Sequence, residues 1–281
     1  GVSEKQSNAI FAHVDGVRNI MRRASREKHC QWLIAMVPTV EWAEYILDKK
    51  GEEALTELWD ILLKLCYIDE TNDVVETWER LREQKASRGK AVDALGLKKL
   101  HYTASNGTDL TVELTPWSKF GYEGRPAVTF TPNIPTEEIC TTPAKYGTNG
   151  VVYASRPLVL GGKKIENFGF RFAQGKVVEV LADEGKEMLE ALVATDENAG
   201  YLGEAALVEY HSPISMSGLV YYTTLIDENA SCHLALGRGL NSSPEGHPDL
   251  FNDSTIHIDF MIGTADMRIV GTTETGEEVE I

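Results

Sequence analysis

Up to about residue 98, apolar side chains recur every three or four residues along the chain. Ile10, Val14, Val17 and Met21 have this spacing, which places them on one face of an amphipathic helix. The same pattern predicts further helices, and Thr39 is placed to cap the next one. The predicted helices cover residues 7–28, 40–50, 52–68 and 72–95.

Residues 31–38 interrupt the helical pattern with a continuous apolar run, QWLIAMVP, that ends at Pro38. A short apolar run of this kind predicts a buried strand. A strand between helices is typical of an α/β unit. Residues 1–98 are therefore expected to be the C-terminal part of an α/β N-terminal domain.

From residue 99, apolar and polar residues alternate instead. The segment KLHYTASNGTDLTVELT alternates on both sides of Asn106-Gly107, which is typical of a β-hairpin. Helices are expected at 185–195 and from near residue 227. Residues 99–281 are thus predicted to form an α+β domain with a curved, largely antiparallel sheet. Its other strands are expected within residues 127–135, 150–162, 165–182 and 264–281.

Charge and cysteine usage limit the expected partners and location. The chain has 27 Lys+Arg and 43 Asp+Glu, a net charge of −16, so binding of nucleic acid through counterion release is not expected. No run of 18 apolar residues occurs, and the N-terminal sequence lacks the features of a signal peptide, so no membrane span or secretion is expected. The scattered cysteines predict reduced thiols and a cytoplasmic protein; they are Cys30, Cys66, Cys140 and Cys232.

The segment STIHIDFMIG, residues 254–263, places an imidazole and a carboxylate inside an apolar run. Residues two apart in a strand point to the same face, so His257 and Asp259 project together while Ile258 and Phe260 face the other way. One interpretation is the solvated face of an amphipathic strand. The other is a pair of metal ligands held on a rigid strand.

Four other polar residues break apolar runs in the second part of the chain. Glu137 and Glu138 follow a predicted strand, and Glu204 begins another. His233 lies on the helix predicted from near residue 227. Taken singly, these are typical of a solvated turn, a surface position and a satisfied core histidine. Together with the His-x-Asp pair, they supply carboxylates and imidazoles that suit zinc, cobalt, manganese or magnesium in a hydrolytic site, with enough carboxylates to bridge two ions.

Four motifs containing these residues follow one another along the chain: N-I-P-T-E-E (133–138), L-G-E-x-A-L-V (202–208), D-E-N-A-S-x-H-L-A-L-G (227–237) and H-x-D-F-M-I-G (257–263). They resemble, in the same order, the motifs of the thermophilic-type metallo-aminopeptidases, a family of intracellular dinuclear exopeptidases that includes leucyl aminopeptidases. The similarity extends to segments such as PTVEWAEYIL and SGLVYYTTLIDENA, so it covers most of the chain.

The resemblance implies a metal-dependent aminopeptidase that releases leucine-like N-terminal residues, with broad preference, through water activated by two divalent ions. Glu137 is our candidate for the catalytic proton acceptor. The expected partners are peptides with a free N-terminus and, in a homodimer, a second copy of the chain. The family's metal ligands fall on Glu138, Glu204, His233, His257 and Asp259.

Two features depart from the family pattern. Leu240 stands where the family often has a tyrosine, seven residues after His233. Family members also have a longer N-terminal domain, so residues 1–98 are expected to be a truncated part of it. The alternatives are a family member that keeps the fold without activity, another metal-dependent peptide or amide hydrolase, and an interaction module with no metal site.

Overall fold

The computed structural model of the chain describes residues 20, 24, 33–120 and 131–281. The chain falls into two units, Gly1–Met36 with Glu123–Ile134 and Val37–Tyr122 with Pro135–Ile281. Residues 98 and 99, between which a domain boundary was predicted, both lie in the larger unit. That residues 1–98 are part of a separate N-terminal domain stays a prediction. Apart from residues 20 and 24, the helix predicted over 7–28 lies outside the described residues.

In the smaller unit, β1 (Ile34–Ala35) pairs in parallel with β4 (Asn133–Ile134). A strand was predicted here, but its predicted burial is wrong: Leu33 and Ile34 are 56% and 47% exposed. Two strands of two residues each offer no continuous face that other side chains could cover. The apolar run at residues 31–38 therefore does not indicate a buried core strand.

The larger unit begins with the helices α2 (Val40–Ile46), α3 (Gly51–Leu65) and α4 (Val74–Ala94). The hydroxyl of Thr39 accepts a hydrogen bond from the amide of Trp42 at 3.2 Å, which confirms the predicted cap of α2. Asp73 caps α4 through two amides of its first turn. No described helix is both long enough and apolar enough to cross a membrane.

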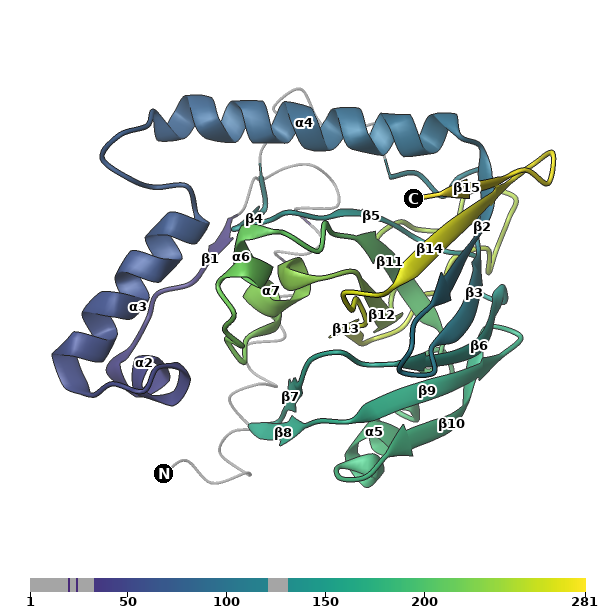
Figure 1. Ribbon diagram of the computed structural model, residues 1–281. Coiled ribbons are helices and arrows are strands. Elements are labelled where there is room, and N and C mark those ends of the chain that lie inside the picture. The colour runs from purple at the N-terminus through teal and green to yellow at the C-terminus, as the bar shows by residue number, and fades with distance from the viewer. Residues whose placement is uncertain (1–19, 21–23, 25–32, 121–130) are drawn as a thin grey trace. The chain divides into compact units, whose positions relative to one another are not determined.

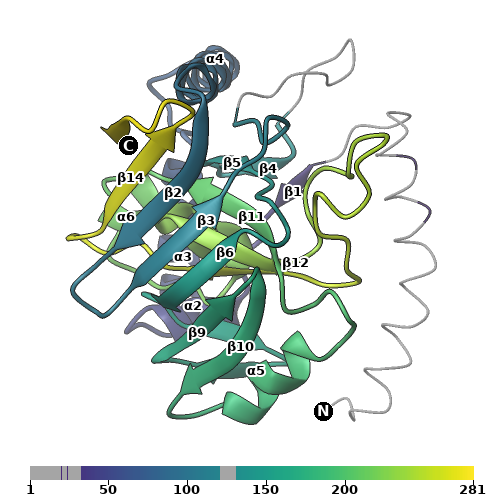
Figure 2. The same ribbon diagram turned by 90° about the vertical axis from the view of Figure 1, so that its right-hand side faces the viewer.

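The larger sheet consists of β2 (Leu97–Thr103), β3 (Asp109–Glu113), β6 (Thr148–Tyr153), β9 (Phe168–Ala173), β10 (Lys176–Ala182), β14 (Arg268–Thr273) and β15 (Glu278–Glu280). Its seven strands are antiparallel and follow the order β10-β9-β6-β3-β2-β14-β15, with a twist that Figures 1 and 2 show. The hairpin predicted around Asn106-Gly107 joins β2 to β3, and Gly107 has φ +97°. The large antiparallel sheet is confirmed.

The smaller sheet consists of β5 (Ile139–Thr141), β11 (Leu202–Leu207), β12 (His233–Gly237) and β13 (His257–Met261), in the antiparallel order β13-β12-β11-β5. The helix predicted to carry His233 is wrong. The helical turns α7 (Thr224–Asp227) and η1 (Glu228–Ala230) end before it, and His233 is the first residue of β12. Every residue of β12 is buried between two neighbouring strands, and a strand buried on both faces lacks the alternation that would distinguish it from a helix.

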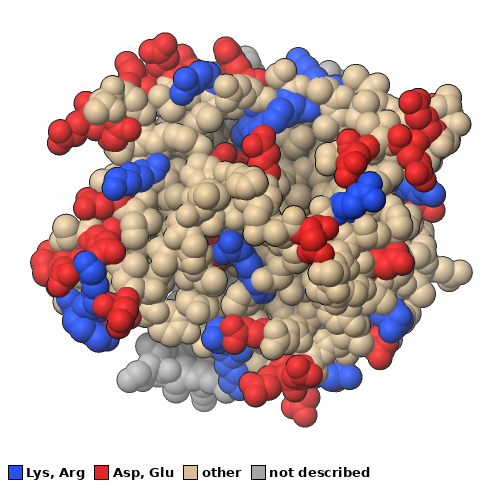
Figure 3. Space-filling model, in the orientation of Figure 1, with Lys and Arg blue, Asp and Glu red and all other residues tan. Residues whose placement is uncertain are grey.

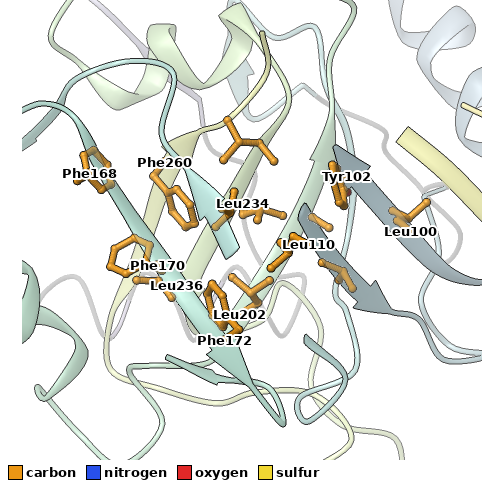
Figure 4. Close-up of a cluster of buried hydrophobic side chains, with 14 of the residues drawn as sticks. Leu100, Tyr102, Leu110, Phe168, Phe170, Phe172, Leu202, Leu234, Leu236 and Phe260 are labelled. Carbon is orange, nitrogen blue, oxygen red and sulfur yellow. The ribbon is translucent and has the colours of Figure 1, made fainter. Parts of the chain in front are cut away.

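A hydrophobic core fills the space between the two sheets of the larger unit. Phe168, Phe170 and Phe172 of β9 pack against side chains of β12 and β13 (Figure 4). The rings of Phe170 and Phe260 have centroids 5.2 Å apart. Even-numbered residues of β12 and β13 therefore face the core, and odd-numbered residues face away from it. The described residues also form β7 (Leu158–Leu160), β8 (Lys163–Ile165), α5 (Lys186–Val193) and α6 (Pro213–Met216).

Charged side chains of both signs are interspersed over the face shown in Figure 3. Among the described residues on that face, Lys and Arg are separated by Asp, Glu and uncharged side chains. Groups that bind a phosphate backbone usually gather in one basic patch. The expectation that nucleic acid is not a partner stays a prediction.

Candidate metal centre

The register of the smaller sheet brings four predicted ligands to one face. Glu204 on β11 lies opposite Ala235 on β12, and Ala235 lies opposite Asp259 on β13. Cross-strand partners point to the same face, and so do residues two apart along a strand. His233 and His257 therefore share the face of Glu204 and Asp259. The opposite face of β13 belongs to the core, which accounts for an imidazole and a carboxylate within an apolar run.

Small residues occupy the positions between the ligands. Ala235 stands between Glu204 and Asp259, so only a methyl group separates the two carboxylates along that row. Gly237 follows on the same face, with φ +98°. A Cβ at Gly237 would lie 2.3 Å from the backbone oxygen of Ile256, which no side chain could tolerate without a shift of the backbone. The small residues of β12 thus leave space for the ligand atoms on this face of the sheet.

The ligand atoms gather in two groups that share Glu204. In the first group, Nε2 of His233 lies 3.0 Å from Oε2 of Glu138 and 3.7 Å from Oε1 of Glu204. In the second, Nε2 of His257 lies 3.2 Å from Oε2 of Glu204 and 3.3 Å from Oδ1 of Asp259. Within each group the three ligand atoms lie within 4.8 Å of one another. Glu204 turns one oxygen to each group, as a carboxylate that bridges two ions would.

Backbone carbonyls orient both imidazoles. Nδ1 of His257 lies 2.7 Å from the carbonyl oxygen of Arg238, and Nδ1 of His233 lies 3.3 Å from that of Ser231. Because a carbonyl oxygen only accepts hydrogen bonds, Nδ1 carries the proton in each neutral ring. Nε2, the atom that faces the carboxylates, is then the one with a free lone pair for a metal.

The carboxylate of Glu138 fits a metal ion better than it fits its protein neighbours. Its Oε2 is buried and lies 3.0 Å from Nε2 of His233, yet it has no hydrogen bond of acceptable geometry with any described residue. Two ligand atoms that both point at one metal ion lie close together without the geometry of a hydrogen bond, because neither points at the other. Carboxylate and imidazole donors are also the set that divalent ions accept in hydrolytic sites.

Burial and opposite charges compete in setting the pKa values of the cluster. Burial disfavours the charged ring of His257, but Asp259 and Glu204 outweigh it and raise its pKa to about 11. Burial also opposes the charged ring of His233, and Glu138 and Glu204 nevertheless raise its pKa. The pKa of Glu204 is lowered against burial by the two histidines. Protons and divalent ions therefore compete for the same cluster.

Metal binding is expected to release protons near neutral pH. The pKa values of His233 and His257 are raised, so both rings are protonated there, whereas a ligating imidazole must be neutral. We expect about one proton released per ion bound, and a higher metal affinity as the pH rises. Calorimetric titration with zinc in two buffers of different ionisation enthalpy measures this number. A release close to zero would contradict the raised pKa values.

A buried amide holds the turn that carries Glu137 and Glu138. Oδ1 of Asn229, in η1, accepts hydrogen bonds from the amide of Glu137 at 2.7 Å and from that of Glu138 at 3.2 Å. Asn229 is fully buried. The segment that precedes β5 is thereby fixed to the segment that precedes β12, and the carboxylate of Glu138 is directed toward His233.

Replacing Asn229 with alanine is expected to lower the free energy of unfolding by about 1–3 kcal/mol, because two buried amides lose their acceptor. Zinc affinity should fall as well, since Glu138 is no longer held in place. Urea unfolding and zinc titration measure the two effects. Asn149→Ala is the matched control, because Asn149 accepts from the amide of Gln174 at an exposed position. Equal stability of the two variants would count against this role of Asn229.

Glu137 adjoins Glu138 in the chain but faces another set of partners. The hydroxyl of Tyr67 donates to Oε1 of Glu137 at 2.8 Å. Burial raises the pKa of Glu137, more than Tyr67 and Lys85 lower it. Lys85 of α4 donates to the hydroxyl of Thr136 at 2.8 Å. Glu137 belongs to neither ligand group of the described residues.

Sequence reasoning missed Glu228 as a member of the site. Burial raises its pKa well above the usual range, and the charges of Glu138 and Asp259 add to the effect. Glu228 lies in the motif of residues 227–237, but the sequence around it does not predict that its side chain is buried. A carboxylate at the start of a predicted helix is ordinarily solvated, so only the fold reveals it.

The position of the family's tyrosine, Leu240, carries an apolar side chain that is 49% exposed. Its amide donates to the hydroxyl of Thr142 at 3.1 Å. The hydroxyl that a tyrosine would bring is therefore absent from this described position.

A family model described as thermophilic metalloprotease (M29) matches residues 1–281. The chain is 40% identical over 271 residues to Aminopeptidase 2 of Geobacillus stearothermophilus, a match that covers 91% of this chain and 64% of that protein. It is 35% identical over 294 residues to Aminopeptidase AmpS of Bacillus subtilis, which covers 100% of this chain and 71% of the relative.

Among solved structures, wild-type AmpT from Thermus thermophilus is similar, with a TM-score of 0.77 and 34% sequence identity. The match covers 89% of this chain and 63% of AmpT. The chain therefore spans less than two thirds of the length of Aminopeptidase 2 and of AmpT.

Proposed function

Because the chain belongs to the M29 family of thermophilic metalloproteases, we propose that it is a metal-dependent aminopeptidase that releases leucine-like N-terminal residues from peptides, with broad preference. The observation that carries this proposal is the carboxylate of Glu204, which turns one oxygen to each ligand group. A shared carboxylate of this kind suits a centre that holds two ions side by side. The names of the relatives, which are called aminopeptidases, support the same reaction.

In this proposal each ligand group holds one divalent ion: zinc, cobalt, manganese or magnesium. Glu138, Glu204 and His233 would hold the first ion, and Glu204, His257 and Asp259 the second. When bound, the ions polarise the scissile carbonyl and lower the pKa of water. The residues of the chain fix the ligand atoms, and their burial limits competition by solvent for the same positions.

The free N-terminus of a peptide is a cation, and the centre is rich in carboxylates. Glu228 interacts electrostatically with Glu138 and Asp259 without belonging to either ligand group, and Glu137 adjoins Glu138 in the chain. An ionised carboxylate beside the ligand groups would pair with the α-amino group, which favours removal of the first residue over cleavage within a chain. A peptide with an acetylated N-terminus lacks that charge.

We place the proton acceptor on one of these two carboxylates. Glu137 is the candidate from the sequence, and the structure adds Glu228. Burial raises the pKa of both groups, and it raises that of Glu228 well above its usual value. A raised pKa suits a carboxylate that takes up a proton near neutral pH and then gives it to the leaving amine.

Glu137→Gln is expected to lower kcat by about 100- to 10,000-fold while two ions remain bound, since glutamine keeps the shape of the side chain but accepts no proton. Glu228→Gln is the matched variant. Leucinamide kinetics and metal content are measured for both. If Glu228→Gln loses turnover and Glu137→Gln keeps it, the role belongs to Glu228.

The reaction is tested with the cobalt-loaded chain, leucinamide and N-acetyl-leucinamide. Release of leucine from the first compound alone is the expected result. Cleavage of the acetylated compound would favour another amide hydrolase. Two bound ions without turnover of either compound would favour a family member that keeps the fold and lacks activity. We also propose a cytoplasmic homodimer, and light scattering of the purified chain tests the dimer.

A further inference from the structure

Among the described strands, β13 is at the edge of the smaller sheet, where it pairs with β12 along one side (Figure 1). Two hydrogen bonds establish which of its backbone groups point away from β12. The amide of Arg238 donates to the oxygen of Ile256 at 2.7 Å, and the amide of Ile262 donates to the oxygen of Cys232 at 2.9 Å. Even-numbered residues of β13 therefore bond to β12, and odd-numbered residues direct their N–H and C=O groups outward.

One outward group of β13 has a backbone partner: the amide of Ser155 donates to the oxygen of Met261 at 2.8 Å. Within the part of the chain that the structure describes, no hydrogen bond involves the backbone N–H or C=O of His257 or Asp259. We call these four groups the open edge. The side chains of His257 and Asp259 are 21% and 13% exposed, so solvent reaches the side chains at this end of the strand.

The residues of the open edge are also ligands of the second group. His257 and Asp259 direct their side chains to the candidate metal centre and their peptide groups to the open edge. A ligand that reaches the centre from this side passes along the outer edge of β13. Unpaired strand edges bind extended peptides readily, because both partners have backbone groups at matching spacing.

We infer that the open edge binds the extended main chain of the peptide substrate on the leaving-group side of the scissile bond. Outward groups two residues apart are about 7 Å from each other, the spacing of alternate residues in an extended peptide. Main-chain pairing gives affinity without regard to side chains, which suits broad preference. The inference rests on the proposed function and specifies the substrate: peptides with a free extended backbone, rather than single amino-acid amides.

The segment around Ser155 limits the open edge at its Met261 end. Its amide already occupies the oxygen of Met261. The hydroxyl of Ser155 is buried and has no hydrogen-bond partner among the described residues. A bound main chain would therefore pair with His257 and Asp259 and stop near this hydroxyl. Every second peptide N–H of the bound main chain should hydrogen-bond to the open edge, over the few residues that lie beside His257 and Asp259.

A set of matched probes tests this pairing. The parent is a leucyl-trialanine peptide with a phosphinic group in place of the scissile amide, and two variants carry a single N-methyl group on the third or on the fourth residue. Calorimetry with the full cobalt-loaded chain measures their affinities. Methylation at one position should weaken binding by about 3- to 10-fold, and methylation at the other should change it little. Equal effects, no effect at either position, or no binding of the parent would overturn the inference.

The failure of this inference can be told apart from the failure of the proposed function. If the chain binds two ions and releases leucine from leucinamide, but the two methylated probes bind equally well, the proposed function stands. The open edge is then not a peptide site. A folded chain that binds no ion loses the proposed function, whatever the probes do.

Discussion

Replacing Glu204 with glutamine is expected to remove both ions and to lower kcat/KM for leucinamide by about 1,000-fold or more, since several kcal/mol of transition-state stabilisation are lost. The two oxygens of Glu204 serve different ligand groups. A glutamine offers a neutral oxygen to one group and an NH₂ to the other. Each group then keeps two charged or imidazole ligands where about three are needed. Elemental mass spectrometry and leucinamide kinetics measure the outcome.

Glu179→Gln is the control for this substitution. Glu179 lies on β10 and pairs with Arg171 at 2.7 Å on the surface, away from both ligand groups. It should retain two ions and full turnover. A Glu204→Gln chain that keeps either ion at wild-type affinity would contradict the shared carboxylate.

His233→Ala and His257→Ala are each expected to remove one ion and leave the other, because each ligand group contains one histidine. Turnover should fall by about 100-fold or more in both variants. Loss of a residue that only hydrogen-bonds to a metal ligand already lowers metal affinity or activity by about 10- to 100-fold. The remaining ion should bind more weakly than in the wild type, because the charge balance around Glu204 changes. Metal content after zinc incubation and desalting distinguishes one ion from two.

His101→Ala is the matched control for the histidine variants. His101 is exposed on β2 and lies 2.7 Å from Asp109 across the hairpin. This variant should bind two ions. If His233→Ala and His257→Ala both lose the same ion, or both lose two, the ligands do not form two groups.

Local signals in the sequence predicted much of the larger unit. Thr39 caps a helix because its hydroxyl reaches an amide three residues on, and Asn106-Gly107 turns a hairpin because glycine accepts a positive φ. These effects act over a few residues and survive in almost any tertiary context. The run at residues 31–38 was different: whether apolar residues are buried depends on what covers them, which no local pattern records.

Residue type and spacing indicated a possible metal site and the family resemblance implied its ligands, but neither gave their arrangement. The His257-x-Asp259 pattern places two side chains on one face of a strand wherever that strand lies. That Glu204 joins them follows from the register with Ala235, a long-range pairing. His233 was expected on a helix because a short apolar run has no period of its own once both faces are buried. The parts played by Asn229 and Glu228 could be recognised only in the fold, where Asn229 accepts from the amide of Glu138 and the buried Glu228 interacts with Glu138 and Asp259.

The number of ions bound to the wild-type chain tests the account most directly. Native mass spectrometry of the full chain, after incubation with zinc and buffer exchange, counts the ions on each folded molecule. We expect two zinc ions per wild-type chain and none on Glu204→Gln. A folded wild-type chain that carries one ion or none at saturating zinc would contradict a dinuclear centre built around Glu204.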